Sequence, residues 1–196
     1  MRYEAGHKEK TRERVLIEAA KAIRTVGPHR VAVADVMAKA GLTHGGFYAH
    51  FKSKDDLVAA GIGQMFEEAK GRMVLDATDL TAAQRLTSYI GFYLSPQHRD
   101  TRSASCPLPF LNADAPRLTA ASRQRFAAGV AHLETQMARN LAELGRPEPD
   151  LEAGCVLAEL VGALSLSRAE PDPDRSDLIL RRSREGLFTR LGLEAA

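Results

Sequence analysis

The 196-residue sequence contains no tryptophan, only two cysteines, and few aromatic residues, which make up 6% of the chain. Two cysteines cannot form the disulfide framework of a small secreted domain. The most apolar stretch, 153–167, is interrupted by Glu159 and is too short to span a membrane. The first residues also lack the apolar core of a signal peptide. We therefore expect a protein of a reduced cytoplasm with no membrane partner.

Motifs of enzymes and metal sites are missing as well. The sequence has no glycine-rich phosphate loop and no nucleophile motif. His98 and His132 have no cysteine or carboxylate at the spacing of metal ligands. We expect no catalytic residue, no metal and no cofactor. An enzyme is the remote alternative, and measured turnover of a candidate ligand would favour it.

Charge is distributed unevenly along the chain. Residues 1–54 carry eleven Lys or Arg against five Asp or Glu, a net charge of +6. The remaining residues carry sixteen against twenty, a net charge of −4. A basic N-terminal region and a mildly acidic remainder are typical of a nucleic-acid-binding domain joined to a domain that binds another partner.

Helical periodicity extends over nearly the whole chain, and period-two alternation is absent, so the sequence predicts an all-α fold of about nine helices. Thr81 and Gln84 begin one of these helices, and Ser95-Pro96 closes it. The predicted helices are 8–26, 33–40, 44–50, 53–74, 81–94, a short segment within 106–114, 118–144, 150–169 and 175–191, with a polar loop over 97–105.

The most informative stretch, residues 31–54, predicts two short helices joined by a tight turn. Gly41 ends the first helix, and Thr43 is placed to cap the second. The second helix is too short to be stable alone, so Phe47 and Phe51 must hold it by packing. This is the layout of a helix-turn-helix that binds DNA. The displayed residues, and therefore the predicted DNA contacts, are Thr43, His44, Gly45, Gly46, Tyr48, His50, Lys52 and Lys54.

Most of these side chains suit phosphates, which position a protein on DNA without reading its sequence. His44, at the exposed tip, is by elimination the best candidate for a base contact, and His50 is better suited to a phosphate. Gly45 and Gly46 each cost up to about 1 kcal/mol in a helix. Two explanations are open: the backbone approaches DNA closely, or the two helices pack tightly together.

The run 33–58, VADVMAKAGLTHGGFYAHFKSKDDLV, closely resembles the DNA-binding domain of the TetR family of bacterial transcriptional repressors. Its glycine turn, aromatic residues and lysines stand where that family has them. The chain departs from the family at Ala32, where Thr or Ser is common, and at Gly46, where a side chain is more usual. The resemblance implies DNA-contacting roles for Thr43, His44, Gly45, Tyr48, His50 and Lys54.

The resemblance covers about the first third of the chain and implies the helical TetR architecture for the rest. We expect a helix-turn-helix domain over 1–54, a connecting helix over 54–75, and an effector-binding and dimerisation domain over 76–196. Lys8, Lys10, Arg12 and Arg14 crowd the start of the first predicted helix, which is unfavourable for the helix dipole. A nearby phosphate would relieve this conflict; a solvated basic end is the alternative.

One small head buries too little surface for tight binding, so we expect a homodimer on a palindromic double-stranded DNA operator. The last two predicted helices carry more apolar surface than one face can bury. An intrachain core is one explanation for this surface, and the resemblance favours a four-helix dimer interface. The predicted interface residues are Val156, Leu157, Leu160, Leu164, Leu180, Leu187 and Phe188.

By family analogy, a small-molecule effector of unknown identity binds among the helices of the second domain. The predicted lining residues, which could equally be plain core, are Phe92, Phe110, Phe126, Met137 and Leu141. Cys106 follows a loop with Arg99 and Arg102 and precedes a predicted short helix, and both features lower a thiol pKa. Some similar TetR-type repressors respond to electrophiles or oxidants. Cys106 is therefore a redox-sensing hypothesis, with a small buried apolar residue as its alternative.

Cys155 lies within an apolar predicted helix and is expected to be structural. Together these features predict a ligand- or redox-responsive transcriptional regulator. It would repress as a homodimer and leave the operator when an effector binds or a thiol is modified. Activation in place of repression, or a ligand-independent DNA-binding or protein-interaction module, are the alternatives.

Overall fold

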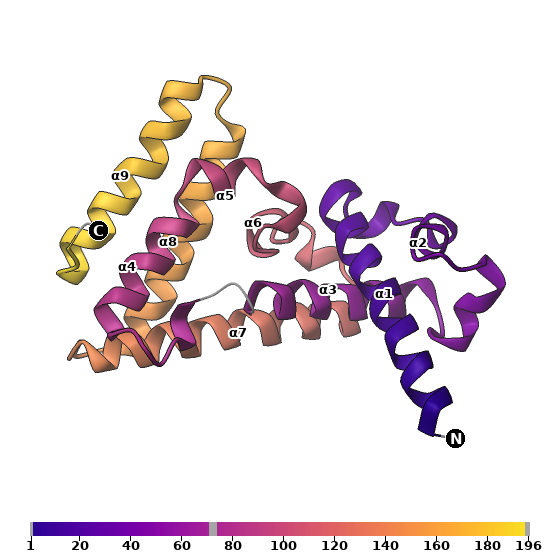
Figure 1. The fold of residues 1–196 in the computed structure, drawn as a ribbon. Helices are drawn as coiled ribbons and strands as arrows, with labels where there is room; N and C mark the ends of the chain where they lie inside the picture. The colour runs from indigo at the N-terminus through magenta and orange to yellow at the C-terminus, as the bar shows by residue number, and fades with distance from the viewer. Residues whose placement is uncertain (1, 71–73, 195–196) are drawn as a thin grey trace. The chain divides into compact units, whose positions relative to one another are not determined.

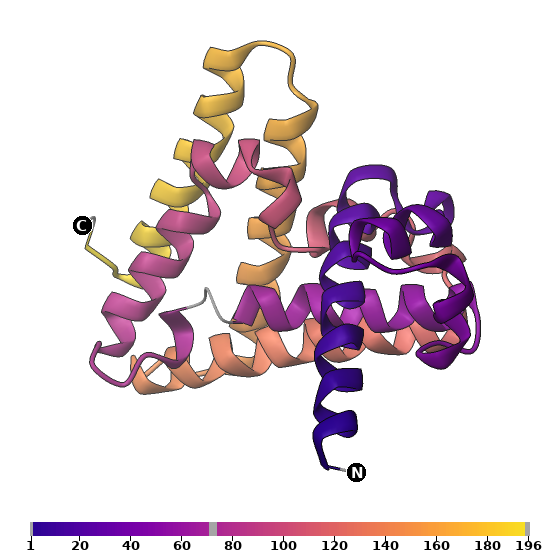
Figure 2. The same ribbon diagram turned by 45° about the vertical axis from the view of Figure 1, so that its right-hand side comes forward.

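The computed structural model describes residues 2–70 and 74–194, which form nine α-helices and five short 3-10 helices without a β-strand (Figures 1 and 2). The all-α prediction is confirmed. The α-helices are α1 (Arg2–Val26), α2 (Val33–Lys39), α3 (Lys54–Lys70), α4 (Ala82–Tyr93), α5 (Pro96–Asp100), α6 (Leu108–Leu111), α7 (Ala120–Glu143), α8 (Pro149–Ala169) and α9 (Pro173–Leu191). The 3-10 helices are η1 (Pro28–Arg30), η2 (His44–Ala49), η3 (Val74–Asp76), η4 (Arg102–Ala104) and η5 (Ala115–Arg117).

The chain divides into two compact units, each with its own core. The N-terminal unit comprises residues 1–69 together with 110–129, and the C-terminal unit comprises 70–109 together with 130–196. The expected second domain, residues 76–196, therefore corresponds only in part to the C-terminal unit. The segment 110–129 packs with the head, although it lies far from the head in sequence.

The core of the N-terminal unit is built from the apolar stripes of α1, α2 and α3. Gly27 and Gly41 end α1 and α2 with φ values of 82° and 73°, a backbone region in which a β-carbon is disfavoured. Ala32 stands at the N-cap of α2 and makes no side-chain hydrogen bond, as expected from its missing hydroxyl. The fully buried side chains of this unit include Ile23, Met37, Phe51, Leu57, Ile62, Met65 and Leu111.

Two contacts within the N-terminal unit fix α3 against its neighbours. The buried Arg24 of α1 forms an ion pair with Glu68, at 2.7 Å, and also donates to the Met65 carbonyl oxygen. On the α7 side, the Phe66 ring lies 6.0 Å from the Phe126 ring in an edge-to-face contact. A β-carbon at Gly129 would come within 2.4 Å of the Phe66 ring, so this close approach requires glycine.

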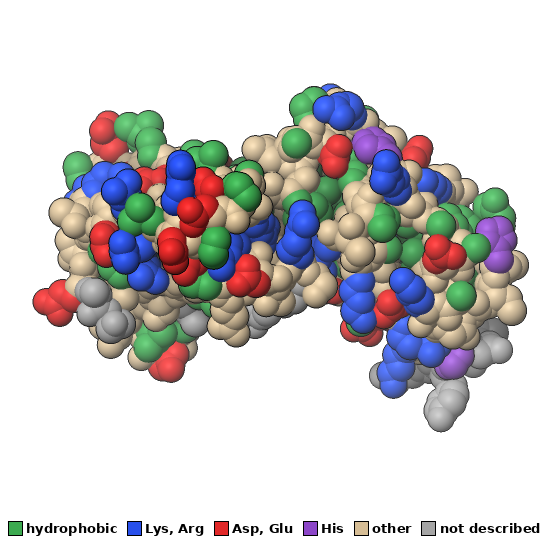
Figure 3. Space-filling model, turned by 90° about the horizontal axis from the view of Figure 1, so that it is seen from above, with side chains coloured by type: hydrophobic (Ala, Val, Ile, Leu, Met, Phe, Trp, Pro, Cys, Tyr) green, Lys and Arg blue, Asp and Glu red, His purple; other side chains and the backbone are tan. Residues whose placement is uncertain are grey.

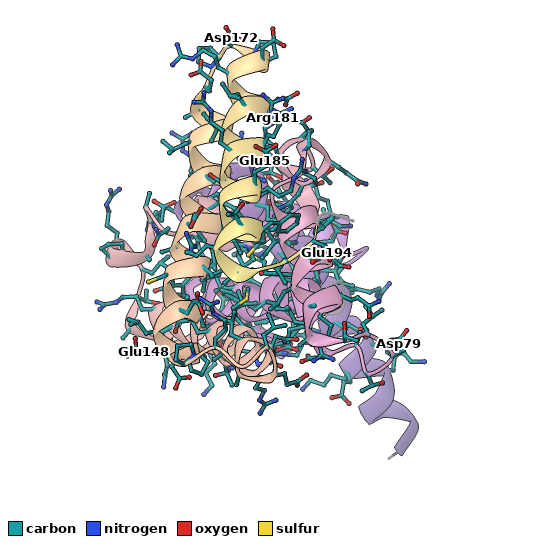
Figure 4. The ribbon with its side chains drawn as sticks, turned by 90° about the vertical axis from the view of Figure 1, so that its left-hand side faces the viewer. Asp79, Glu148, Asp172, Arg181, Glu185 and Glu194 are labelled. Atoms are coloured by element: carbon teal, nitrogen blue, oxygen red, sulfur yellow. The ribbon has the colours of Figure 1, made fainter. Side chains whose placement is uncertain are left out.

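The C-terminal unit is centred on the hairpin of α8 and α9, which run antiparallel side by side and pack against α4 (Figure 4). The buried Arg85 of α4 joins this helix to α7 through hydrogen bonds to Asn140, at 2.5 Å, and Glu143. Asn140 in turn donates to the Leu75 carbonyl oxygen at 3.1 Å. Outside this core, side chains of both charges are interspersed on the surface (left part of Figure 3).

Several boundaries differ from those predicted. Helix α1 begins at Arg2, six residues before the expected start, so its basic residues lie inside the helix and not at its end. Helix α5 occupies part of the predicted loop 97–105. Residues 71–73, near the end of the predicted helix 53–74, lie outside the described residues. The capping box of Thr81 and Gln84 at the start of α4 is confirmed.

Candidate nucleic-acid interface

The recognition segment is a 3-10 helix, η2, and not the short α-helix that was predicted. Its anchors are Phe47 and Phe51, each 2% exposed, whose rings stack at 5.7 Å. The Tyr48 ring packs edge-on against Phe47 at 5.2 Å. A six-residue segment gains few helical hydrogen bonds, so this aromatic cluster is what holds it in place.

The residues predicted to contact DNA lie together around this segment. Tyr48 is the most prominent of them, with 73% of its surface exposed. Gly46 and His50 are partly buried. The exposed members are Thr43, His44, Gly45, Tyr48, Lys52 and Lys54. Basic and histidine side chains are visible on the surface of this unit at the right of Figure 3.

Two of these residues have surroundings that differ from the expectation. Thr43 precedes η2 but makes no side-chain capping hydrogen bond, so the predicted cap is wrong and its exposed hydroxyl is not engaged in a cap. Lys54 donates from its Nζ to the His29 carbonyl oxygen at 2.8 Å, which joins the start of α3 to η1. The carbonyl is neutral, and the positive charge of Lys54 is therefore not cancelled.

The structure excludes tight interhelical packing as the reason for the two glycines. A β-carbon at Gly45 would meet no atom within 4 Å, and one at Gly46 would lie 3.8 Å from the methyl group of Met37, an ordinary contact. Both glycines also have negative φ values. Close approach of the backbone to a ligand outside the chain is the explanation that is left.

We predict that Gly45→Ala keeps the fold but weakens DNA binding by about tenfold or more, the scale of one lost base contact. The added methyl group points into open space in the free protein and would meet DNA in the complex. Thermal denaturation and fluorescence anisotropy with operator DNA measure the two effects. Gly91→Ala on α4, where an added β-carbon would likewise meet no atom within 4 Å, is the matched control. Unchanged DNA affinity in Gly45→Ala would contradict the prediction.

The predicted dimer-interface residues of α8 and α9 are located in the interior of the C-terminal unit. Val156, Leu160 and Leu187 are fully buried. The prediction that this set forms a free face is wrong for six of its seven members, because the chain buries them against itself. These six are Val156, Leu157, Leu160, Leu164, Leu180 and Leu187; Phe188 is partly buried.

The predicted effector-lining residues are divided between the two units. Phe126 belongs to the N-terminal unit, where its ring contacts Phe66, and Phe110 is in the same unit. Met137 and Leu141 are buried in the C-terminal unit. Phe92 is 46% exposed, and its ring stacks on His98 at 5.1 Å. The five residues therefore do not line a site within one unit.

Cys106 is buried in a polar cluster that the sequence did not reveal. Its backbone N–H donates to Nε2 of His98 at 3.1 Å, and Nδ1 of His98 lies 2.9 Å from the Tyr93 carbonyl oxygen. Because Nε2 accepts a hydrogen bond, Nδ1 carries the proton and donates to this carbonyl. His98, described above as isolated in sequence, thus fixes the backbone at Cys106.

Two tyrosines complete the surroundings of the thiol. Tyr89 and Tyr93 are buried, and burial raises the pKa of both phenols, with a further contribution from Cys106. The Tyr89 hydroxyl has no hydrogen-bond partner among the described residues. The expected helix-dipole effect on Cys106 is not supported, since α6 has only four residues. Arg99, predicted to act on the thiol, instead pairs with Asp100 and Asp177.

Cys155 is exposed on α8, so its expected structural role in a core is wrong. Within the ranges 2–70 and 74–194, no cluster of three or more His, Cys, Asp or Glu residues could hold a metal ion. None of the described helices is both long enough and apolar enough to cross a membrane.

Comparisons with known proteins agree with this geometry. Residues 15–60 match the family model described as bacterial regulatory proteins, tetR family. No curated protein sequence matches the chain. Among solved structures, a TetR transcriptional regulator from Chloroflexus aurantiacus J-10-FL has 23% identity and a TM-score of 0.78, with 98% of this chain and 97% of that chain covered.

Two further structures have the same fold at lower identity. The TetR-family regulator from Cytophaga hutchinsonii has 18% identity and a TM-score of 0.79, covering 97% of this chain and 98% of its own. The reduced form of E. coli NemR has 19% identity and a TM-score of 0.77, covering 92% and 97%. These similarities extend the match from the head to the fold of nearly the whole chain.

The N-terminal unit is therefore a helix-turn-helix of the kind that binds DNA. Residues 15–60 match the TetR-family DNA-binding domain, and nearly the whole chain has the fold of TetR-family transcriptional regulators. Members of this family are generally DNA-binding proteins without enzymatic activity, typically repressors.

Proposed function

We propose that this protein is a homodimeric repressor that binds a palindromic operator and leaves it when a small molecule binds or Cys106 is modified. The observation that carries the DNA-binding part is the recognition segment. Six exposed residues are displayed around a 3-10 helix that two buried phenylalanines hold in place. Such a protein acts where the bacterial operator is, in the cytoplasm.

A face of α8 that the chain leaves exposed supports the dimer. Leu151 and Leu166, each 63% exposed, stand at its two ends. Between them, at intervals of three or four residues, lie the exposed Cys155 and Ala158 and the partly buried Gly162. The stripe is uncharged, and its small central residues allow a second helix to approach closely.

The neighbouring helix α9 provides charges that suit a two-fold contact. Arg181 and Glu185 are exposed on α9 (Figure 4). In an isologous contact, each residue of one copy meets its complement on the other, so a surface with both charges can pair with itself. We assign the α8 stripe to a second copy of this chain, in place of the buried residues predicted from the sequence.

The test of the proposed function is a gel-shift on DNA upstream of the protein's own gene, with unrelated DNA as competitor. We expect a specific retarded complex that oxidants or a member of an effector panel release. Specific binding that no compound in the panel and no oxidant changes would favour the ligand-independent alternative. The absence of any specific complex would contradict the proposal.

The thiol hypothesis makes a separate prediction. Hydrogen peroxide oxidises a thiolate to sulfenic acid and is itself reduced to water. We expect this reaction at Cys106 to lower operator affinity by about tenfold or more, because a polar adduct must fit among the buried Tyr89, Tyr93 and His98. Anisotropy before and after peroxide treatment measures the change.

The two cysteines provide matched variants for this experiment. Cys106→Ser is expected to bind DNA with an affinity that peroxide does not change. Cys155→Ser is expected to lose operator affinity after peroxide treatment as the unaltered protein does. Equal responses of Cys106→Ser and the unaltered protein would exclude Cys106 as the sensor.

A further inference from the structure

A second group of positive charges lies next to the recognition segment, on α1. Lys8 and Arg12 are four residues apart and therefore lie on the same side of this helix. Lys8 is exposed and Arg12 is partly buried. In the part of the chain that the structure describes, neither side chain forms an ion pair. Two like charges at this spacing repel each other, so the helix gains nothing from them by itself.

A series of ring contacts connects these charges to the segment that displays the predicted DNA contacts. The guanidinium of Arg12 lies 5.0 Å above the centre of the Phe51 ring. Phe51 stacks on Phe47, which in turn contacts Tyr48. The cation–π contact fixes the Arg12 side chain against the base of η2. All of these residues belong to the N-terminal unit.

His50 adds a third group that can carry positive charge. Its ring lies 6.5 Å from that of Phe51, and its Nδ1 atom is buried without a hydrogen-bond partner among the described residues. Desolvation lowers the pKa of His50, and the positive charges of Lys8 and Arg12 lower it further. Both side chains are therefore within electrostatic range of the imidazole. No carboxylate contributes to this shift.

Three cationic groups without a carboxylate partner form a site that suits an anion. A guanidinium donates two parallel hydrogen bonds to phosphate oxygens, and lysine and protonated histidine add charge. The position of the group beside η2 favours a phosphate of the DNA to which η2 binds. The helix dipole does not explain it, because α1 begins at Arg2 and Lys8 and Arg12 lie beyond its first turn.

We propose that Lys8, Arg12 and His50 together bind one phosphate of the DNA backbone, so that the DNA contact extends from the helix-turn-helix onto α1. This inference rests on the proposed DNA-binding function and adds Lys8 and Arg12, which lie outside the run that resembles the family, to the predicted contact of His50. When the phosphate binds, it displaces water from around the basic side chains of α1. It also stabilises the protonated form of His50, so DNA binding takes up a proton.

The test measures operator affinity by anisotropy as a function of salt for Lys8→Gln and Arg12→Gln. We expect each variant to bind more weakly, with a salt slope shallower by about one unit, and to lose affinity equally for specific and unrelated DNA. Arg12→Lys keeps the charge and is expected to keep most of the slope. The matched control is Arg14→Gln, which removes the same charge from an exposed position on another side of α1.

A pH series tests the role of His50. Because the bound phosphate raises the pKa of the imidazole, affinity is expected to rise as the pH falls from about 8 to about 6. His50→Gln should flatten this dependence, whereas His44→Gln should leave most of it. Circular dichroism of every variant establishes that the head is folded. The same affinity and slope in Lys8→Gln, Arg12→Gln and Arg14→Gln would overturn the proposal, as would an unchanged pH dependence in His50→Gln.

Inorganic phosphate distinguishes a DNA contact from a site for the free ion. We expect the NMR signals of the His50 ring to move with operator DNA and not with millimolar phosphate. Movement with phosphate while the variants bind DNA normally would overturn the DNA assignment. If the unaltered protein binds no DNA, the proposed function fails and the phosphate contact fails with it. Specific DNA binding that is the same in the unaltered protein, Lys8→Gln and Arg12→Gln overturns the phosphate contact alone.

Discussion

Ala158→Arg is expected to leave the chain folded but monomeric and to lower operator affinity by about 100-fold, the avidity that two linked heads provide. Ala158 is exposed in the middle of the uncharged α8 stripe, so the longer side chain costs nothing in the monomer. In a two-fold dimer each arginine would face the same region of the partner helix. Its charge would be buried there without a counter-charge, which strongly disfavours association.

Light scattering after size-exclusion chromatography measures the assembly, and anisotropy measures DNA binding. The control is Ala142→Arg, the same change at an exposed position of α7 outside the stripe. We expect this control to remain dimeric with ordinary DNA affinity. A dimeric Ala158→Arg protein would show that the second copy does not cover the α8 stripe.

The second large effect concerns stability. Glu68→Gln is expected to lower the free energy of unfolding by about 2–3 kcal/mol and the melting temperature by roughly 5–10 °C. The side chain of Arg24 is 1% exposed, so removing the charge of Glu68 leaves a buried guanidinium without its counter-ion. Glu68 is 23% exposed, which places the expected cost below that of breaking a fully buried pair.

The same geometry predicts an asymmetry between the two partners. Arg24→Met removes the buried charge and leaves a carboxylate that water can reach, so its cost should be the smaller of the two. The double variant should be more stable than Glu68→Gln alone. Urea denaturation of the three variants measures these differences. Equal costs for the two single variants would contradict the argument from burial.

Local sequence signals predicted the head well, because they depend on neighbouring residues. Gly41 ends α2 through its own backbone conformation, and Thr81 caps α4 with a partner three residues away. Helix α5 was missed although its signal was present. Ser95-Pro96 closes α4, and it also begins α5, with Ser95 as N-cap and Pro96 at the first helical position.

The identity of the exposed residues on α8 could not be predicted in the same way. Apolar residues of α8 lie on every side of the helix, so periodicity does not distinguish the side that packs within the chain from the side left exposed. Leu160 and Leu166 are both leucines on the same helix, yet the first is fully buried and the second is 63% exposed. Their difference depends on where α4 and α9 lie. The residues predicted for the dimer were therefore taken from the side that packs within the chain.

From the order of residues alone follow the all-α fold, the TetR-type helix-turn-helix and the set of residues around η2. Turns, caps and periodicity depend on residues that are close together in the sequence, so the sequence predicts them directly. Folding brings together groups distant in sequence, such as Arg12 with Phe51, His98 with Cys106, and Arg24 with Glu68. Burial and electrostatic coupling depend on such distances in space, so the anion site, the thiol's surroundings and the exposed α8 stripe emerge only in the folded chain.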